Sequence, residues 1–578
     1  MKKIINKPEN VVMEMCAGIV LAHPHLEFLP EPKVIKRKKL NPAKVSLISG
    51  GGSGHEPAHA GFVGPGMLDA AVCGDVFASP SQIQVYKAIQ ATANEKGTLL
   101  IIKNYSGDMM NFQNAAHLAQ EDGILVDYVK IDDDIAVQDS LYTVGRRGVA
   151  GTVFVHKIAG AAAEQGRSLA EVKALAEKVN ENVKSIGFAL TSCTIPAKGS
   201  PIFELPESDM EYGVGIHGEP GIVRSEMQQA DELASRMLLS LCSELNLAKG
   251  DRIALMVNGF GATPLMELYL MNTAVAKKLH DKGIIIARTF VGNYMTSIDM
   301  AGASVTLLKL DDELETLLNE PCETPGFNVS GAVDSVPFTD YSAGAVAAQT
   351  WETPAAYAQV GEKFSRENMV YLVDAIGASC IHNEAAFCEL DSHAGDGDFG
   401  TSVAKGFREL KHQWARIAKA PTIGEFLDEC SLVIMEHCGG ASGPIWGSAF
   451  RAAGKQAGDK TALSVREMAD VLQAVVKGIQ ATGERSFGRG AVVGDKTLID
   501  ALVPCADAWT AAAKDGLCFA EAFKNGAKAA VEGAKTTENI TARMGRAGTV
   551  GERSLGHPDA GAHALGVIFT EISEQLKF

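Results

Sequence analysis

The hydrophobic pattern of the 578-residue chain changes near residue 330, and no single fold class accommodates both patterns. Before that point, short apolar runs alternate with helical stretches, and five of them read as strands: 45–49, 98–102, 124–131, 252–258 and 283–291. Alternating strands and helices are typical of parallel or mixed α/β sheets. After that point the strand signal disappears, and amphipathic helical patterns recur between glycine-rich breaks. The sequence therefore predicts an α/β module followed by an all-α module.

The two modules are separated by the segment 331–358, which is rich in small residues and proline and has little periodicity. Such a composition is typical of a linker. We expect an α/β domain over 1–330, with two lobes because its length exceeds one compact core, and an all-α domain over 359–578. Eight helical segments are predicted in the second domain: 363–388, 402–418, 423–437, 445–457, 464–480, 497–513, 517–535 and 560–576.

Composition excludes several classes of protein. Lys and Arg total 53 against 70 Asp and Glu, so the net charge is −17 and gives no general attraction to nucleic acid or anionic lipid. There is no apolar run of about 18 residues and no signal-peptide pattern. The 11 cysteines occur singly, without a CxxC pair, which fits a reducing compartment. We expect a cytoplasmic protein that binds neither nucleic acid nor a membrane.

Three carboxylates, Asp391, Asp396 and Asp398, lie within eight residues and are separated by glycines. They would repel one another, and a divalent cation that prefers hard oxygen ligands, such as Mg²⁺, resolves that repulsion. An EF-hand loop is excluded because His393 and Gly395 would occupy two of its carboxylate positions. The remaining alternative is a solvated acidic turn whose aspartates cap helices.

Glycine-rich turns precede several of the predicted helices, at 438–444, 494–497 and 545–562. A turn of this kind offers free backbone N–H groups and a positive helix end to a phosphate, although each alone also fits an ordinary connection between helices. Together with the carboxylates they indicate a Mg–nucleotide site. The chain has no GxxxxGK[ST] motif, and the formal GxGxxG match at 213–218 is predicted neither to follow a strand nor to open a helix.

Two polar loops in the first module follow predicted strands, at 50–57 and 104–108. Ligands of α/β proteins bind at the carboxyl ends of strands, where such loops converge. Ser53 and the backbone amides around it could hold ligand hydroxyls, and His55 could move a proton. His217 is flanked by glycines that allow close approach of a ligand, but a loop histidine is more often a structural hydrogen-bonding group.

Several of these motifs resemble those of the dihydroxyacetone kinase family. GGGSGHEPAHAGFVGPGMLDAAVCGDVFASPS, KNYSGD and GIHGEPG are similar to its substrate half, and LDSHAGDGDFGTS, GGASGPIWG, GDKTLIDAL and GERSLGHPDAGA to its nucleotide half. The resemblance covers nearly the whole chain except the linker. It implies a two-lobed α/β ketose-binding domain followed by an eight-helix α-barrel that holds ATP through Mg²⁺, with two ions expected. Both halves lie on one chain, which implies ATP as the phosphate donor rather than a phosphotransferase relay, and a homodimer.

The resemblance also implies roles for individual residues. His217 matches the histidine that forms a covalent hemiaminal with the ketose, Asp108 the residue that acts on the hydroxyl receiving phosphate, and His55 the residue that assists. Substrate contacts match Gly52, Ser53, Gly54 and Lys103. Metal ligands match Asp391, Asp396 and Asp398. Nucleotide contacts match Phe399, Gly400, Thr401, Ala441, Ser442, Thr497, Leu498, Asp559, Ala560 and Gly561.

The activity expected from this resemblance is ATP-dependent phosphorylation of dihydroxyacetone (glycerone) to dihydroxyacetone phosphate. A related short ketose or aldose, such as erythrulose or glyceraldehyde, is the alternative substrate, and a non-catalytic ketose- and nucleotide-binding regulator is the alternative of another class. FAD cyclisation at the same metal site is a third possibility. Arg489, Gly548 and Ala560 depart from the family pattern around the base or ribose, which leaves the nucleotide preference open.

Overall fold

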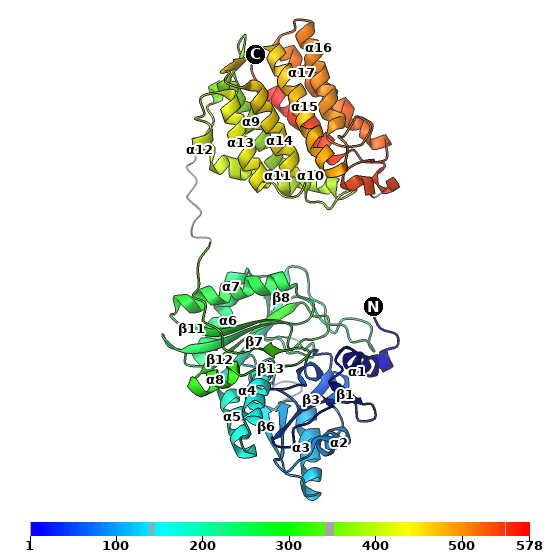
Figure 1. Ribbon diagram of the computed structural model, residues 1–578, viewed down its shortest axis with the longest axis vertical. Coiled ribbons are helices and arrows are strands. Elements are labelled where there is room, and N and C mark those ends of the chain that lie inside the picture. Colours follow the sequence, from blue (N-terminus) through cyan, green and yellow to red (C-terminus); the bar gives the residue numbers. More distant parts are fainter. Residues whose placement is uncertain (1, 139–143, 220, 342–351, 550) are drawn as a thin grey trace. The chain divides into compact units, whose positions relative to one another are not determined.

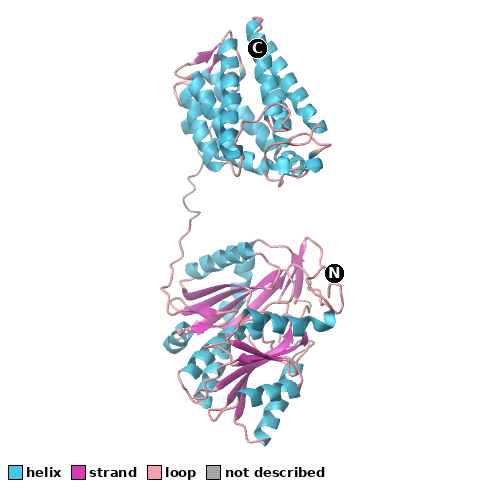
Figure 2. Ribbon diagram, turned by 45° about the vertical axis from the view of Figure 1, so that its right-hand side comes forward, coloured by secondary structure: helices cyan, strands magenta, loops and turns pink. Residues whose placement is uncertain are grey.

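The computed structural model describes residues 2–138, 144–219, 221–341, 352–549 and 551–578. The chain forms two compact units, Met1–Ala343 and Gly344–Phe578 (Figures 1 and 2). The first is α/β and the second is helical, so the predicted fold class is confirmed. The predicted linker 331–358 lies partly outside the described residues, and the division into 1–330, 331–358 and 359–578 stays a prediction. Among the described residues, no helix carries an apolar stretch long enough to cross a membrane.

The first sheet has the strand order β1-β2-β4-β3-β5-β6. Its strands are β1 (Leu26–Leu29), β2 (Val34–Arg37), β3 (Ser46–Ser53), β4 (Ala70–Val76), β5 (Thr98–Lys103) and β6 (Val126–Ile131). Strands β4, β3, β5 and β6 run parallel, whereas β1 and β2 join the edge in antiparallel fashion. Alternate residues of β5 face opposite cores: Leu100 packs with the cluster of helices α2 (Gln82–Thr92) and α3 (Ser106–Glu121), and Leu99 with that of α4 (Thr152–Glu164) and α5 (Leu169–Asn182).

Strand β3 is longer than the sequence pattern predicts, because it continues through three glycines to Ser53. The neighbouring backbone explains this choice of residue. A Cβ added at Gly50 would lie 2.5 Å from the Val72 carbonyl oxygen, and one at Gly52 would lie 2.7 Å from the Ala78 amide nitrogen. Glycine therefore lets the strand end pass close to the next strand and delivers Ser53 and His55 to the sheet edge.

The second sheet has the order β11-β10-β12-β7-β8-β9. Its strands are β7 (Val183–Ala189), β8 (Asp209–Tyr212), β9 (Val223–Glu226), β10 (Arg252–Gly259), β11 (Ile285–Gly292) and β12 (Gly302–Leu310). Helices α6 (Ala230–Glu244) and α7 (Leu265–Asp281) pack on one face. The other face shares a core with the first sheet, and the almost wholly buried helix α4 lies in that core. The remaining helices of this unit are α1 (Val11–Ala22) and α8 (Asp312–Asn319).

The second unit is built mainly from helices. They are α9 (Arg366–His382), α10 (Glu384–Asp391), α11 (Phe399–His412), α12 (Trp414–Ile417), α13 (Ile423–His437), α14 (Ser442–Ala457), α15 (Val465–Phe487), α16 (Ile499–Lys514), α17 (Phe519–Thr536) and α18 (Ala560–Gln575). The predicted segment 363–388 is two helices, because the chain breaks at Asn383, whose side chain donates to the Ser379 carbonyl oxygen at 3.0 Å. The predicted segment 402–418 is likewise divided, at Gln413.

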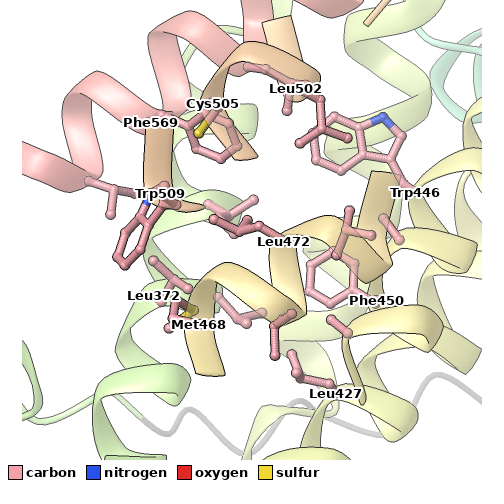
Figure 3. A pocket seen from close by; sticks show the side chains of 18 of the residues that line it. Leu372, Leu427, Trp446, Phe450, Met468, Leu472, Leu502, Cys505, Trp509 and Phe569 are labelled. Carbon is pink, nitrogen blue, oxygen red and sulfur yellow. The ribbon is translucent and has the colours of Figure 1, made fainter. Parts of the chain in front are cut away.

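The apolar faces of these helices line a cavity of about 160 Å³ (Figure 3). The predicted stripe of α15 lines it with Met468, Leu472 and Ile479, and Trp509 lines it as well. Three side chains line both this cavity and a neighbouring polar pocket: Ile445, Trp446 and Leu498. The helical unit therefore presents an apolar interior and, beside it, a polar pocket that contains the sequence motifs.

Candidate active site

Two histidines from distant parts of the chain meet in the α/β unit. His55 follows β3, His217 lies in the loop between β8 and β9, and their Nε2 atoms are 3.1 Å apart. The other ring nitrogen of His55, Nδ1, lies 2.8 Å from the Thr296 carbonyl oxygen. Because a carbonyl oxygen only accepts, His55 Nδ1 carries the proton of the neutral ring and His55 Nε2 is the acceptor. It follows that His217 Nε2 donates its proton to His55.

Both rings are neutral at pH 7. Burial, with the charge of Lys103, lowers the pKa of His55 well below 6.5. Burial also lowers the pKa of His217, and His55, Lys103 and Arg147 add to the effect. A second buried pair lies nearby, His59 and His156, whose Nδ1 and Nε2 atoms are 3.0 Å apart. Burial lowers the pKa of His156 to about 3 and that of His59 well below 6.5.

These four neutral histidines predict that the α/β unit loses stability in mild acid. Below pH 6.5 the unfolded chain protonates its histidines while the folded rings stay neutral, so the unfolded state binds more protons and is favoured as pH falls. The cost is about 1.4 kcal/mol per histidine for each pH unit below 6.5. The melting temperature should therefore decrease as the pH is lowered from about 7.5 to 5.5. His156→Gln should make this decrease of melting temperature with pH less steep. A melting temperature that is constant over this range would contradict the assignment of neutral rings.

An aspartate and a lysine lie beside the histidine pair. Asp108, in the first turn of α3, accepts a hydrogen bond from Ser79, and Lys103 ends β5. A Cβ added at Gly51 would lie 3.3 Å from Asp108 Oδ2 and 3.5 Å from Lys103 Nζ, so both groups flank this glycine. Burial raises the pKa of Asp108, although Lys103 opposes the shift, and burial lowers the pKa of Lys103. Among the described residues, none accepts a hydrogen bond from the buried Lys103 ammonium.

The walls around the histidines are aromatic and glycine-lined. The Tyr105 ring is 4.5 Å from that of His217, and the Phe77 ring stacks on His55 at 5.2 Å. Gly54 leaves room for this stacking, since a Cβ there would lie 2.8 Å from the Phe77 ring. The Ser53 hydroxyl donates to the Gly74 carbonyl oxygen at 2.7 Å, so its proton is already used within the protein.

In the helical unit, the three predicted carboxylates converge between α10 and α11. Asp391, Asp396 and Asp398 each place an oxygen within 4.8 Å of the others. Asp391 Oδ2 accepts the Gly397 amide at 2.9 Å, which fixes the turn. Three carboxylates so close together repel one another, and their hard oxygen donors fit a divalent cation such as Mg²⁺.

A polar pocket of about 200 Å³ opens beside this carboxylate cluster. Of the predicted nucleotide contacts, these line it: Phe399, Ala441, Ser442, Thr497, Leu498, Asp559, Ala560 and Gly561. Gly400 and Thr401 are not among its lining residues. They face α10 instead, where the Thr401 amide donates to Cys388 Sγ at 3.3 Å and a Cβ at Gly400 would lie 2.1 Å from the Glu384 carbonyl oxygen.

Asp559 lines this pocket as the N-cap of α18. Its Oδ2 accepts the Ala562 amide at 2.8 Å. Burial, with the charges of the neighbouring carboxylates Asp500 and Asp391, raises the pKa of Asp559 to about 7.

Two residues that sequence reasoning missed hold the 494–497 turn in place. Lys496, although it belongs to a recognised motif, turns inward and donates to the carbonyl oxygens of Thr537, Ser554 and His557 at 2.5–2.7 Å. The Asp500 carboxylate accepts the amides of Gly494 and Thr497 at 2.6 and 2.8 Å. Lys496 belongs to the motif at 494–497, but the motif alone does not show that its side chain connects this turn to the glycine-rich loop at 545–562.

Arg489, one of the residues that depart from the family pattern, forms an ion pair within its own loop. Its guanidinium pairs with the Asp495 carboxylate at 2.5 and 2.9 Å, and Asp495 also accepts the Val492 amide. Arg489 therefore closes the loop that precedes the 494–497 turn.

Comparison with known proteins identifies both units. A Dak1 domain matches residues 17–326 and a DAK2 domain matches residues 393–574. Over 314 residues the chain is 54% identical to the dihydroxyacetone-binding subunit of a PTS-dependent dihydroxyacetone kinase from Listeria innocua, covering 54% of this chain and 95% of that subunit. It is 36% identical to the L-erythrulose 1-kinase of Mycolicibacterium smegmatis, with 100% of both chains covered.

A solved structure extends this likeness to three dimensions. The dihydroxyacetone kinase from C. freundii in complex with AMP-PNP and Mg²⁺ matches with a TM-score of 0.61 and 32% identity, covering 99% of each chain. Two domain matches, a relative that is similar over its full length and a solved kinase structure all agree with the geometry of the site. We conclude that the chain is an enzyme that belongs to the dihydroxyacetone kinase family.

Proposed function

We propose that this kinase transfers the γ-phosphate of ATP to a primary hydroxyl of dihydroxyacetone, giving dihydroxyacetone phosphate and ADP. The observation that carries the proposal is the neutral pair of His55, which is buried, and His217, which is half-buried, 3.1 Å apart and beside the buried Lys103 and Asp108. This set of groups suits a small molecule that has a carbonyl next to a hydroxyl. The 54% identity to a dihydroxyacetone-binding subunit supports dihydroxyacetone over longer ketoses.

His217 is the proposed nucleophile toward the ketone. Its Nε2 bonds to the carbonyl carbon, the carbonyl π electrons move to oxygen, and the Nε2 proton passes to His55 Nε2 and from there to that oxygen. The product is a hemiaminal, and His55 is returned to its neutral form. The Thr296 carbonyl contributes by holding the His55 proton on Nδ1, which leaves Nε2 free to accept. Glycerol has no carbonyl and should be rejected for that reason.

Asp108 is the proposed base for the phosphorylated hydroxyl. Burial raises its pKa, which improves it as a proton acceptor at neutral pH. The hydroxyl oxygen bonds to the γ-phosphorus as Asp108 takes its proton and ADP leaves. Lys103, with Gly52, Ser53 and Gly54, is proposed to orient the ketose.

The carboxylate cluster of Asp391, Asp396 and Asp398 is proposed to hold two Mg²⁺ ions. Bound Mg²⁺ neutralises the charge of the phosphates during transfer. The eight predicted nucleotide contacts that line the pocket are proposed to bind ATP. The other two, Gly400 and Thr401, face α10 and are proposed to hold the first turn of α11 in place. A homodimer is the proposed oligomeric state, as the family resemblance implies.

An erythrulose kinase is the second candidate, favoured by full-length similarity to an L-erythrulose 1-kinase. A panel of dihydroxyacetone, both erythruloses and glyceraldehyde, compared by kcat/KM with Mg-ATP, separates the two. We expect the highest kcat/KM for dihydroxyacetone. A higher value for an erythrulose would favour the second candidate, and no turnover with any of these substrates would favour the non-catalytic regulator.

A further inference from the structure

A buried group of three charged residues lies behind the His217 loop. Arg147, Asp134 and Glu219 are only 1%, 2% and 7% exposed. Arg147 Nε donates to Asp134 Oδ2 at 2.7 Å, and its Nη1 donates to Glu219 Oε1 at 3.2 Å. None of the three matches a proposed substrate, metal or nucleotide contact, so the proposed reaction leaves this group unexplained.

The group holds the loop that carries His217 at two points. Arg147 Nη2 donates to the Gly213 carbonyl oxygen at 3.0 Å, at the start of the loop. Glu219 Oε2 accepts the backbone N–H of His217 itself at 2.9 Å. The loop also packs directly against this ion pair, because a Cβ at Gly215 would lie 1.7 Å from Glu219 Oε1 and 2.7 Å from Arg147 Nη1.

Stability alone does not account for these charges. Removing three ions from water is costly, and apolar side chains of similar volume often stabilise a buried site as well or better. What the ions supply is direction: a planar guanidinium with several fixed donors holds a carbonyl and two carboxylates at defined angles. Here those angles determine where the backbone of His217 lies.

We infer that Arg147 and Glu219 are positioning residues that aim His217 at the ketose carbonyl. The inference rests on the proposed covalent role of His217. The imidazole must keep its Nε2 atom 3.1 Å from His55 Nε2 while its ring stays 4.5 Å from Tyr105. A shift of the loop by about 1 Å would separate the nucleophile from its proton acceptor and can cost about 100-fold in rate.

The test measures the covalent adduct directly in the full-length chain. Protein labelled with ¹⁵N-histidine is titrated with dihydroxyacetone labelled with ¹³C at C2, and the one-bond ¹³C–¹⁵N coupling reports the population of the adduct. Two variants perturb the group: Arg147→Lys keeps the charge but not the fork of donors, and Glu219→Gln keeps the shape but not the charge. Lys44→Gln is the matched control, because Lys44 and Asp69 form a buried pair at 2.5 Å that has no hydrogen bond or ion pair with the described residues of the His217 loop.

Both variants should lower the affinity for adduct formation and raise the KM for dihydroxyacetone by about 10- to 100-fold. The KM for ATP should change less than about twofold, and Lys44→Gln should lower the melting temperature without affecting the adduct. If Arg147→Lys fails to fold, Glu219→Gln decides the outcome. Wild-type affinity for the adduct in the folded variants would overturn the positioning role. If instead the wild-type protein forms no ¹³C–¹⁵N bond with any short ketose, the proposed function itself is wrong.

Discussion

Replacing His217 with alanine should lower the turnover of dihydroxyacetone by about 100-fold or more while leaving nucleotide binding intact. The variant removes the atom that bonds to the ketone, and the remaining hydrogen bonds to a freely rotating triose are weak. The nucleotide pocket is lined entirely by residues of the helical unit, so the Kd for Mg-ATP should change less than about twofold. Steady-state kinetics and calorimetric titration of the same preparation measure both quantities.

His117→Ala is the control for this experiment, because the His117 side chain is 73% exposed on α3 and far in sequence from the histidine pair. It should behave as wild type. Full ketose turnover by His217→Ala would remove the covalent step from the account, whereas a joint loss of ketose and nucleotide binding would point to misfolding.

Replacing Asp396 with alanine should abolish phosphate transfer while leaving capture of the ketose by His217 intact. Its carboxylate is one of three that converge within 4.8 Å. Removing it leaves too few oxygen ligands to hold the Mg²⁺ that would neutralise the charge of the phosphate during transfer. Phosphate transfer should fall by about 1000-fold or more. The adduct between the ketose and His217 should still form, because the histidine pair lies in the other unit. Turnover and the ¹³C–¹⁵N coupling, measured together, separate the two effects.

Asp459→Ala serves as the matched control, since Asp459 is exposed in the same unit but outside the carboxylate cluster. Near-normal turnover by Asp396→Ala at saturating Mg²⁺ would show that this carboxylate is not a metal ligand. Loss of the adduct in the same variant would contradict the assignment of ketose capture to the α/β unit.

The order of the two modules and the carboxylate cluster could be read from sequence because their signals are local. The period of the hydrophobic residues indicates which segments are strands and which are helices. The three aspartates lie within eight residues of one another. The extension of β3 through its glycines was not predictable in this way. It depends on the backbone of Val72 and Ala78, which only the folded sheet places nearby.

The groups that support the site are the part that sequence could not supply. His55 and His217 are 162 residues apart, and nothing in either motif gives the 3.1 Å contact or the tautomer that Thr296 imposes. Arg147 lies in no recognised motif, and Lys496 lies in one but turns away from the solvent. Buried ions and buried lysines are determined by tertiary packing, so their roles become visible only when their partners are in place.

The most direct test of the central claim is the NMR spectrum of ¹⁵N-histidine-labelled protein with dihydroxyacetone labelled with ¹³C at C2. The account predicts a one-bond ¹³C–¹⁵N coupling in the wild-type protein, its loss in His217→Ala and its persistence in Asp396→Ala. Phosphorylation of the labelled ketose without any such coupling, or a coupling that survives His217→Ala, would contradict the claim that this histidine captures the substrate.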